Sequence, residues 1–435
     1  MQMLIIGGSG EMGQWFATFF KNEGYDVWIS GRRGRSDVAE KLGVRFTSTP
    51  EEIIPECDVV IVSVPIDITP EIIRQTAPIM KPGSLLMDLT SIKKNPVDAM
   101  IGSAPEGVEL LGTHPMFGPS IPSLQGQTFI LTPVENRCEK WFPIMRELLE
   151  RHGAHIEIIT PQEHDHIVSI VQGLTHFAYI TIGATLKELD FDVQGSRRFM
   201  SPVYEIMLDF VGRILGQNPW LYAQIQMQNP EIPNVHRSFI EQCERLSKLV
   251  VENNADNFCT VMKDASVHFG DTGAALHRSD KLINAKVAEF EELLQSIGKE
   301  KGLYHIYSGK THVGIVEKVM ARSVDILESG KLVNLKIENV RLLNSDELNA
   351  WKNDNLAAKT RDISTYIPEN ADPDTLCHIL GKISEGISCK VHDTYISPDG
   401  RRSATFRIDI RQDIDINKIQ DDIERLLEGI GCILR

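Results

Sequence analysis

A glycine-rich turn directly follows the first apolar run of the chain, at residues 4–6. It places a Gly-x-Gly-x-x-Gly pattern at 8–13, with Gly8, Ser9, Gly10, Met12 and Gly13 as the candidate binding residues. Glycines here allow a tight turn, let the backbone approach a pyrophosphate, and let the next helix pack closely on the strand. The N-terminus of that helix then faces the phosphates. Because the pattern stands between a predicted strand and a predicted helix, it indicates a dinucleotide site rather than a ligand-free turn.

The residues after the second predicted strand, at 27–29, indicate which dinucleotide binds. They read Ser30, Gly31, Arg32 and Arg33, with no acid and two guanidinium groups. An NAD enzyme usually places Asp or Glu here to hold the ribose 2′-hydroxyl, and a carboxylate would repel a 2′-phosphate. Guanidinium groups pair with phosphate. We therefore expect Arg32 and Arg33 to favour NADP over NAD, the alternative being a solvated basic turn.

Polar residues also end the next predicted strands. Ser63 follows the apolar run 59–62, Ser91 follows 85–89, and His114 follows 109–112 within a segment rich in Pro and Gly. Ligands of open α/β sheets bind at the carboxyl ends of the strands, so these side chains are expected near the nicotinamide. A histidine in that place is a candidate general base, although a lone histidine is more often structural.

Two further candidates fall in a helical region. Arg213 stands in the apolar run 206–215, where a buried guanidinium would need an anion from the protein or from a substrate. His176 lies in the stretch 166–186, which has no charged residue. By itself His176 would be read as a hydrogen-bonded core histidine.

The elements that must position these residues form four segments. Residues 1–160 alternate strands and helices, which predicts an α/β Rossmann domain with a mostly parallel sheet. Residues 161–298 read as an all-α domain for substrate binding and dimerisation. Residues 299–355 read as a connector with a hairpin at 323–337. Residues 356–435 follow the order β-α-β-β-α-β of a small α+β, ferredoxin-like domain.

Composition narrows the class of protein. The 435 residues are 42% hydrophobic and 24% charged, as in ordinary globular proteins, and the net charge of −15 disfavours nucleic acid as a partner. The seven cysteines include no CxxC pair, which argues against a disulfide framework or a metal site and favours a reducing cytoplasm. The stretch 166–186 is long enough to span a bilayer. Its polar residues, including Ser169 and Gln172, favour instead a buried helix or a subunit interface, so no membrane association is expected.

Taken together, these motifs resemble the prephenate dehydrogenase family of tyrosine biosynthesis, over about residues 1–295. The segments that carry the resemblance are DLTSIKKNP at 88–96, GTHPMFGPS at 112–120, EHDHIVSIVQGLTHFAY at 163–179, SPVYEIMLDFVGRILGQNPWLY at 201–222 and HFGD at 268–271. The resemblance implies oxidative decarboxylation of prephenate to 4-hydroxyphenylpyruvate, with hydride transfer to NADP+ or NAD+. It also implies a homodimer through the helical domain.

The resemblance further implies a role for four residues. His114 matches the catalytic histidine that takes the proton of the substrate 4-hydroxyl, and Ser91 matches a serine that orients it near the cofactor. Arg213 matches the arginine that binds a substrate carboxylate, and His176 matches a second histidine near the substrate. Many relatives keep an acid after the second strand, so Gly31, Arg32 and Arg33 are a departure from the family pattern.

The last domain has a separate resemblance. Residues 361–364 (RDIS) and 392–410 are similar to the ferredoxin-fold anticodon-binding domain of phenylalanyl-tRNA synthetases. Acidic residues outnumber basic ones over 356–435, which makes a poor surface for tRNA. The same topology serves as an amino-acid-sensing module, so feedback by tyrosine, or dimerisation, is the expected role.

Three alternatives remain open at this stage. One is a reductase that passes hydride between a deazaflavin and NADP, although such enzymes are shorter and lack the HPMFGP segment. Another is arogenate dehydrogenase, because arogenate differs from prephenate only in a side-chain amino group. The third is a non-catalytic protein that senses NADP or tyrosine. The joint presence of His114, Ser91 and Arg213 favours an enzyme.

Overall fold

The computed structural model describes residues 1–31, 34–199 and 201–435. The chain divides into two compact units, residues 1–270 and 271–435, and each is described by itself. The predicted cofactor residues Arg32 and Arg33 lie outside the described residues.

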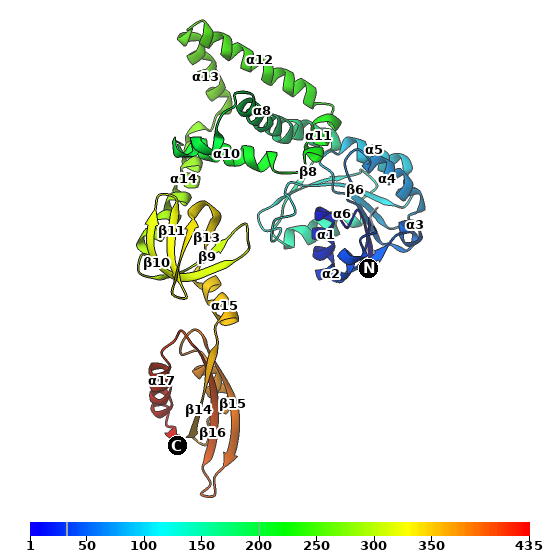
Figure 1. Cartoon of the computed structure of the whole chain (residues 1–435). Coiled ribbons are helices and arrows are strands. Elements are labelled where there is room, and N and C mark those ends of the chain that lie inside the picture. The colour runs from blue at the N-terminus through cyan, green and yellow to red at the C-terminus, as the bar shows by residue number, and fades with distance from the viewer. Residues whose placement is uncertain (32–33, 200) are drawn as a thin grey trace. The chain divides into compact units, whose positions relative to one another are not determined.

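The first unit is drawn in blue to green in Figure 1. It begins with an eight-stranded sheet in the order β3-β2-β1-β4-β5-β6-β7-β8. The pairs from β3 to β6 are parallel, β7 runs antiparallel to β6, and β8 is parallel to β7. This confirms the predicted Rossmann domain. The strands are β1 (Gln2–Ile6), β2 (Asp26–Ser30), β3 (Arg45–Thr47), β4 (Val59–Val62), β5 (Leu85–Asp88), β6 (Glu109–Pro115), β7 (Thr128–Pro133) and β8 (His155–Ile158).

Successive residues of the buried strands point to opposite sides of this sheet, so both of its faces are apolar. Helices cover both faces. In β1, Met3 and Ile5 pack with Phe16 of the first helix, whereas Leu4 and Ile6 pack in a second core with Ile73 of the fourth. The helices are α1 (Glu11–Asn22), α2 (Ser36–Leu42), α3 (Pro50–Ile53), η1 (Ile54–Glu56), α4 (Thr69–Thr76), η2 (Ala77–Ile79), α5 (Lys94–Ser103) and α6 (Trp141–Arg151).

The rest of the first unit is helical, as expected. One continuous helical stretch changes to π-helix over Ser169–Leu174, and α13 is an element that the sequence did not indicate. The elements are α7 (Pro161–Val168), η3 (Ser169–Leu174), α8 (Thr175–Glu188), α9 (Val193–Ser196), η4 (Arg197–Phe199), α10 (Pro202–Leu215), α11 (Pro219–Gln228), α12 (Ile232–Val251) and α13 (Ala255–Phe269).

The second unit begins 28 residues before the expected boundary at 298, and the expected connector at 299–355 contains more than a hairpin. An antiparallel sheet in the order β12-β11-β10-β9-β13 has its own core, and Leu293 of the preceding helix is buried against Val316 and Val324 in it. That burial explains why the helix belongs with the sheet. The elements are α14 (Thr272–Gln295), β9 (Glu300–His305), β10 (Thr311–Met320), β11 (Ser323–Glu328), β12 (Lys331–Lys336), η5 (Ile337–Asn339), β13 (Val340–Leu342) and α15 (Ser345–Asn355).

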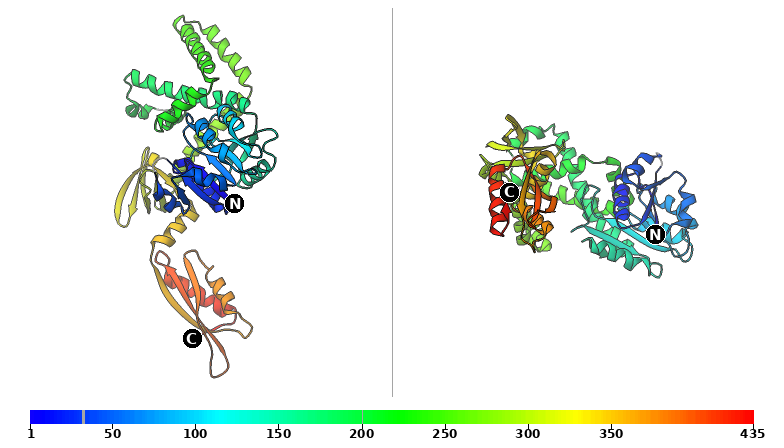
Figure 2. Two further views of the ribbon diagram at one scale, coloured as in Figure 1. Left: turned by 90° about the vertical axis from the view of Figure 1, so that its right-hand side faces the viewer. Right: turned by 90° about the horizontal axis from the view of Figure 1, so that it is seen from below.

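The C-terminal domain has the predicted element order β-α-β-β-α-β. Its antiparallel sheet has the order β15-β16-β14-β17, and α17 lies along it, with Ile423 and Leu427 buried against Phe406 (Figure 2). The elements are β14 (Ala358–Tyr366), α16 (Pro373–Leu380), β15 (Ile387–Ile396), β16 (Arg402–Arg411), α17 (Ile416–Gly429) and β17 (Ile433–Leu434).

Candidate active site

The glycine-rich turn lies between β1 and α1 and leaves no space for side chains at two of its glycines. A Cβ atom on Gly8 would lie 2.6 Å from the Ile29 side chain, and one on Gly13 would lie 2.5 Å from the Gly7 carbonyl oxygen. These glycines therefore allow β1, β2 and α1 to pack closely. Met12 packs against the apolar core behind the turn, so its side chain supports the turn and does not line the cleft in front of it.

A cleft of about 640 Å³ opens at the carboxyl edge of the sheet. A Cβ atom on Gly31 would lie 2.2 Å from Ser9 Oγ, so a carboxylate of the kind typical of NAD enzymes would fit at residue 31 only if the Ser9 side chain moved. The open backbone of the turn and the start of α1 fit a dinucleotide pyrophosphate. The cleft is lined by the glycine turn, by residues at the ends of β2, β3 and β4, and by the residue before α2. These residues are Gly7, Ser9, Gly10, Ser30, Gly31, Thr47, Ser48, Ser63, Val64 and Arg35.

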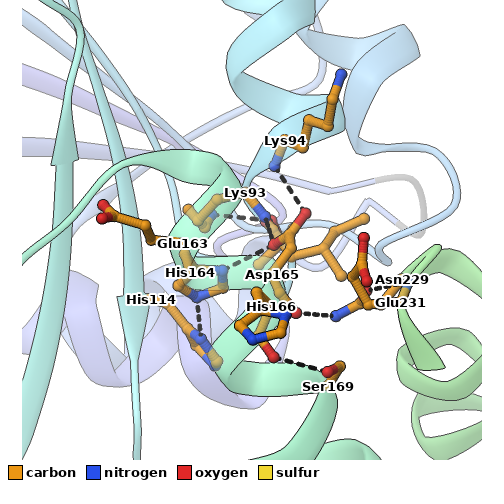
Figure 3. Close-up of polar contacts among 12 residues, drawn as sticks. Lys93, Lys94, His114, Glu163, His164, Asp165, His166, Ser169, Asn229 and Glu231 are labelled. Atoms are coloured by element: carbon orange, nitrogen blue, oxygen red, sulfur yellow. Dashed lines mark hydrogen bonds and ion pairs between the residues drawn. The ribbon is translucent and has the colours of Figure 1, made fainter. Parts of the chain in front are cut away.

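His114 lies on β6 itself, because that strand continues to Pro115 instead of ending at residue 112 as expected. Its side chain is buried, and its two ring nitrogens have different neighbours. His114 Nδ1 lies 2.8 Å from His164 Nε2 (Figure 3). His114 Nε2 lies 3.3 Å from Gln172 Nε2. Strand β6 and the helix that follows β8 therefore meet at this histidine.

The partner His164 is held at the start of α7. The N-cap residue Thr160 and Glu163 form a reciprocal capping box, which fixes the entry into the helix. His164 Nδ1 lies 2.8 Å from Asp165 Oδ1. The Asp165 carboxylate also accepts hydrogen bonds from the backbone amides of Lys93, at 2.7 Å, and Lys94, at 3.0 Å. Because these amides stand at the N-terminus of α5, they stabilise the negative charge of Asp165.

A buried ion pair lies beside these groups. The Lys93 ammonium pairs with Asp88 at the end of β5, and it also donates to Thr90 Oγ1 at 3.2 Å. The Asp88 carboxylate accepts from the backbone amides of Thr90, at 3.0 Å, and Thr113, at 3.2 Å. Burial lowers the pKa of Lys93, and the attraction to Asp88 opposes that shift. Buried charges persist when paired and hydrogen-bonded in this way.

Burial keeps the histidines at the sheet edge neutral. Burial lowers the pKa of His114 well below 6.5, and the electrostatic effects of His164 and Lys93 lower it further. Burial also lowers the pKa of His164, but the hydrogen bond to Asp165 raises it in part. A neutral His114 near pH 7 can accept a proton, which is the property a general base needs.

His176 and Arg213 both lie close to Tyr222 of α11. The rings of His176 and Tyr222 are 4.7 Å apart in an edge-to-face arrangement, and the charge of Arg213 acts to lower the pKa of Tyr222, which burial raises. Burial lowers the pKa of His176 to about 4, so it is neutral at pH 7. Arg213 is exposed within the single chain, so the expectation of a buried arginine was wrong. Its apolar neighbours Phe210 and Leu215 are exposed as well, so the apolar run of α10 does not form buried surroundings for Arg213 within the chain.

The π-helical turn connects the two groups of residues. Gln172 lies in it beside His114, and His176 follows four residues later on the same helical stretch. Among the described residues, the buried atoms Gln172 Oε1 and His176 Nδ1 have no hydrogen-bond partner. Unpaired buried polar atoms are uncommon, and a substrate with polar groups would satisfy them. π-Helical turns recur at functional sites.

The predicted serines lie at the sheet edge. Ser63 lines the cleft, and its amide donates to the Ile6 carbonyl oxygen at 2.8 Å. Ser91 is half-buried in the turn after β5, and no hydrogen bond joins it to His114 in the part of the chain that the structure describes. The role expected of Ser91 therefore stays a prediction.

Four residues of this site were not assigned from the sequence: His164, Asp165, Gln172 and Tyr222. The adjacent His-Asp pair directly after a predicted helix start was the available signal for the first two. Its partners, at positions 93, 94 and 114, are far away along the chain, so no spacing rule could connect them. In the described residues no group of three or more His, Cys, Asp or Glu could hold a metal ion.

A Rossmann sheet with a glycine turn, a cleft at its carboxyl edge and an adjoining helical region define an NAD(P)-dependent oxidoreductase. Residues 16–158 match the family described as "Prephenate dehydrogenase, nucleotide-binding domain", and residues 160–264 match "Prephenate dehydrogenase, dimerization domain". The chain belongs to the prephenate dehydrogenase family.

Individual relatives agree with this assignment. "Probable arogenate/prephenate dehydrogenase" of Methanocaldococcus jannaschii is 39% identical over 432 residues, which cover 98% of this chain and 97% of that protein. The "T-protein" of Haemophilus influenzae is 31% identical over 62% of this chain and 67% of that protein. The solved structure of prephenate dehydrogenase from A. aeolicus, in complex with hydroxyphenyl propionate and NAD+, has a TM-score of 0.50 at 20% identity, covering 62% of this chain and 98% of that one.

Proposed function

We propose that this enzyme converts prephenate to 4-hydroxyphenylpyruvate and CO2 in tyrosine biosynthesis, with NADP+ as the hydride acceptor. The observation that carries the proposal is the buried, neutral His114 at the carboxyl edge of the sheet, hydrogen-bonded through Nδ1 to His164. This arrangement directs the other nitrogen, Nε2, away from His164 and towards Gln172. Nε2 is thus the atom available to a substrate hydroxyl.

The chemistry requires few groups from the protein. When bound, NADP+ supplies the acceptor for the hydride that leaves C4 of the substrate ring. His114 Nε2 takes the proton of the 4-hydroxyl as the C4 carbonyl forms. Loss of the ring carboxylate as CO2 then yields an aromatic ring, which is strongly downhill, so orientation, a base and exclusion of water are the main needs.

We assign the substrate carboxylates to the Tyr222 cluster. Arg213 supplies the positive charge, and His176 supplies the buried Nδ1 atom that has no partner among the described residues. Arogenate remains the alternative substrate, and the M. jannaschii relative is named for both arogenate and prephenate. The absence of a carboxylate at Gly31, together with Arg32 and Arg33, supports NADP rather than NAD.

We also propose a homodimer that covers the apolar surface of the helical region. Among the described residues one helix, Pro161–Glu188, is long and apolar enough to cross a membrane by length and composition, and only 17% of its apolar window is buried within the chain. However, the same helix supplies His164 and Gln172 to the site beside the Rossmann sheet. Ile170 and Val171 are half exposed in the single chain. We therefore propose that they are buried against a second copy of the chain in the cytoplasm rather than in a membrane.

A comparison of substrates and cofactors tests the proposal. Initial rates of absorbance change at 340 nm are measured with prephenate or arogenate, each with NADP+ or NAD+ at equal concentration. We expect the highest kcat/KM for prephenate with NADP+ and one CO2 per NADPH. A higher kcat/KM with arogenate than with prephenate would show that arogenate is the substrate. NADP+ binding without turnover of either substrate would favour the non-catalytic alternative. Inhibition by added tyrosine would support a sensing role for residues 356–435.

A further inference from the structure

We propose that His164, held by Asp165, fixes the tautomer of His114 and receives the proton that His114 releases from Nδ1. His164 is thus a positioning residue that acts through His114, and the two histidines form a proton relay. This inference rests on the proposed function, because His114 must act as the base. It adds roles for His164 and Asp165, which are identified by their residue types and their contacts and not by their spacing in the sequence.

The hydrogen-bond directions follow from which atoms can donate. The Asp165 carboxylate is an acceptor only, and it already accepts from the amides of Lys93 and Lys94. His164 Nδ1, at 2.8 Å from Asp165 Oδ1, must therefore carry the hydrogen. In neutral His164 the Nε2 atom then has a lone pair and accepts.

The same reasoning continues to His114. Because His164 Nε2 accepts, His114 Nδ1 at 2.8 Å must donate. Neutral His114 therefore has its lone pair on Nε2, the nitrogen beside the Gln172 amide. Asp165 thus determines, through one intervening imidazole, which nitrogen of His114 is basic.

The relay moves one proton and returns it. As hydride leaves C4, the 4-hydroxyl O–H bond breaks and its proton binds His114 Nε2, while the His114 Nδ1 proton moves to His164 Nε2. The C–C bond to the ring carboxylate then breaks, CO2 leaves, and that electron pair generates a phenolate. The phenolate oxygen takes the proton back from His114 Nε2 as His164 Nε2 returns its proton to His114 Nδ1. The overall reaction releases no net proton, as the conversion of prephenate and NADP+ to product, CO2 and NADPH requires.

The charges that face the relay favour a proton on His164. Lys93 and Asp88 form one ion pair, so Asp165 is the unbalanced charge of the buried group. A proton on His164 balances the negative charge of Asp165, so the net charge of these buried residues becomes zero. The protonated imidazole also lies next to the Asp165 carboxylate. The pKa directions agree, since burial depresses the pKa of His114 without a carboxylate partner, whereas Asp165 partly restores that of His164.

The variant His164→Gln tests the relay. A glutamine carbonyl can accept the His114 Nδ1 hydrogen bond but cannot hold a proton. We expect kcat with prephenate to fall on the order of 10²-fold, within the range for acid–base groups, with an unchanged Kd for NADP+. The acidic limb of kcat/KM should move to lower pH, because the group that is protonated first has been removed. The matched control is His166→Gln, an exposed histidine of the same helix, which should behave as the wild type.

A loss of activity with the acidic limb unmoved would contradict the relay and indicate a structural role only. Wild-type kcat in His164→Gln would contradict it as well. A measurement without catalysis separates this inference from the proposed function: ¹⁵N NMR of histidine-labelled wild-type protein, with His114→Asn to assign the signal. We expect His114 to be neutral and protonated on Nδ1 at pH 7, and protonation on Nε2 would overturn the inference. Absence of turnover in the wild type would instead refute the proposed function.

Discussion

His114 Nδ1 and His164 Nε2 lie 2.8 Å apart, although the residues are 50 positions apart in the sequence. One belongs to the parallel-sheet domain and the other begins the helical region. The proposed general base on the sheet thus contacts, through its Nδ1 atom, the helical region that also carries Arg213 and His176. Both parts of the first unit are needed to form one site.

Replacement of Arg213 by alanine should mainly weaken substrate binding. A charge-assisted hydrogen bond contributes about 1.5–3 kcal/mol, so we expect KM for prephenate to rise about 10-fold or more with a smaller change in kcat. Steady-state rates at 340 nm measure both. Arg146→Ala, which removes an exposed arginine of α6 paired with Glu150, is the control. An unchanged KM would rule out the assigned role.

Removal of the two arginines after β2 should change cofactor preference. We expect the double variant Arg32→Ala/Arg33→Ala to lose about 10-fold or more in kcat/KM for NADP+, since a charged hydrogen bond contributes about 1.5–3 kcal/mol. The value for NAD+, which lacks the 2′-phosphate, should stay constant. Arg45→Ala serves as the control, because that guanidinium pairs with Asp26 and lies over Trp28. Equal losses with both cofactors would show that the arginines do not recognise the 2′-phosphate.

Gln172→Glu should shift the pH dependence in a known direction. The Gln172 amide nitrogen lies 3.3 Å from His114 Nε2, and a carboxylate there would favour protonated His114. A nearby opposite charge raises a histidine pKa by about 1–3 units, so the acidic limb of kcat/KM should move to higher pH by that amount. Wild-type activity should persist below pH 6.5, because the pKa of His114 is lowered and the base stays neutral there. Gln162→Glu on the exposed side of α7 is the control. If the acidic limb of kcat/KM is the same in both variants, residue 172 does not act on His114.

The oligomeric state tests the proposed cover of the helical region. Light scattering without detergent should give twice the chain mass of 48.8 kDa. Val267 of α13 is 81% exposed, and Val267→Asp should produce a monomer if the helices form the interface. Leu332→Asp, at an apolar position on β12 that is 63% exposed, should leave the dimer intact. Aggregates that dissolve only in detergent would support a membrane-bound helix instead.

Local sequence patterns predicted the elements with strong periodicity or sharp boundaries. The helix expected after the glycine turn is present as Glu11–Asn22, and the strand Val59–Val62 agrees residue for residue with the predicted run 59–62. In contrast, the three-residue strand β3 is too short to show a pattern, and the sheet over residues 300–342 has many polar positions. Its core depends on contacts with Leu293, which no local pattern reveals.

The site was predictable only where function depends on a local motif. The glycine turn follows β1 and His114 lies near the carboxyl end of β6, so both could be placed at the sheet edge from the sequence. Arg213 was expected to be buried because its neighbours in the sequence are apolar, but Phe210 and Leu215 of the same helix are also exposed, so an apolar run does not by itself predict burial within one chain. The His164–Asp165 pair contacts residues 93, 94 and 114, and such long-range contacts need the three-dimensional structure.

The most direct test of the central claim compares the wild type with His114→Asn in prephenate-dependent NADP+ reduction at 340 nm, with NADP+ binding measured on the same samples. We expect robust reduction by the wild type, a loss on the order of 10³-fold in the variant, and an NADP+ Kd that is the same in both. A variant that reduces NADP+ at the wild-type rate would contradict the role of His114 as the base.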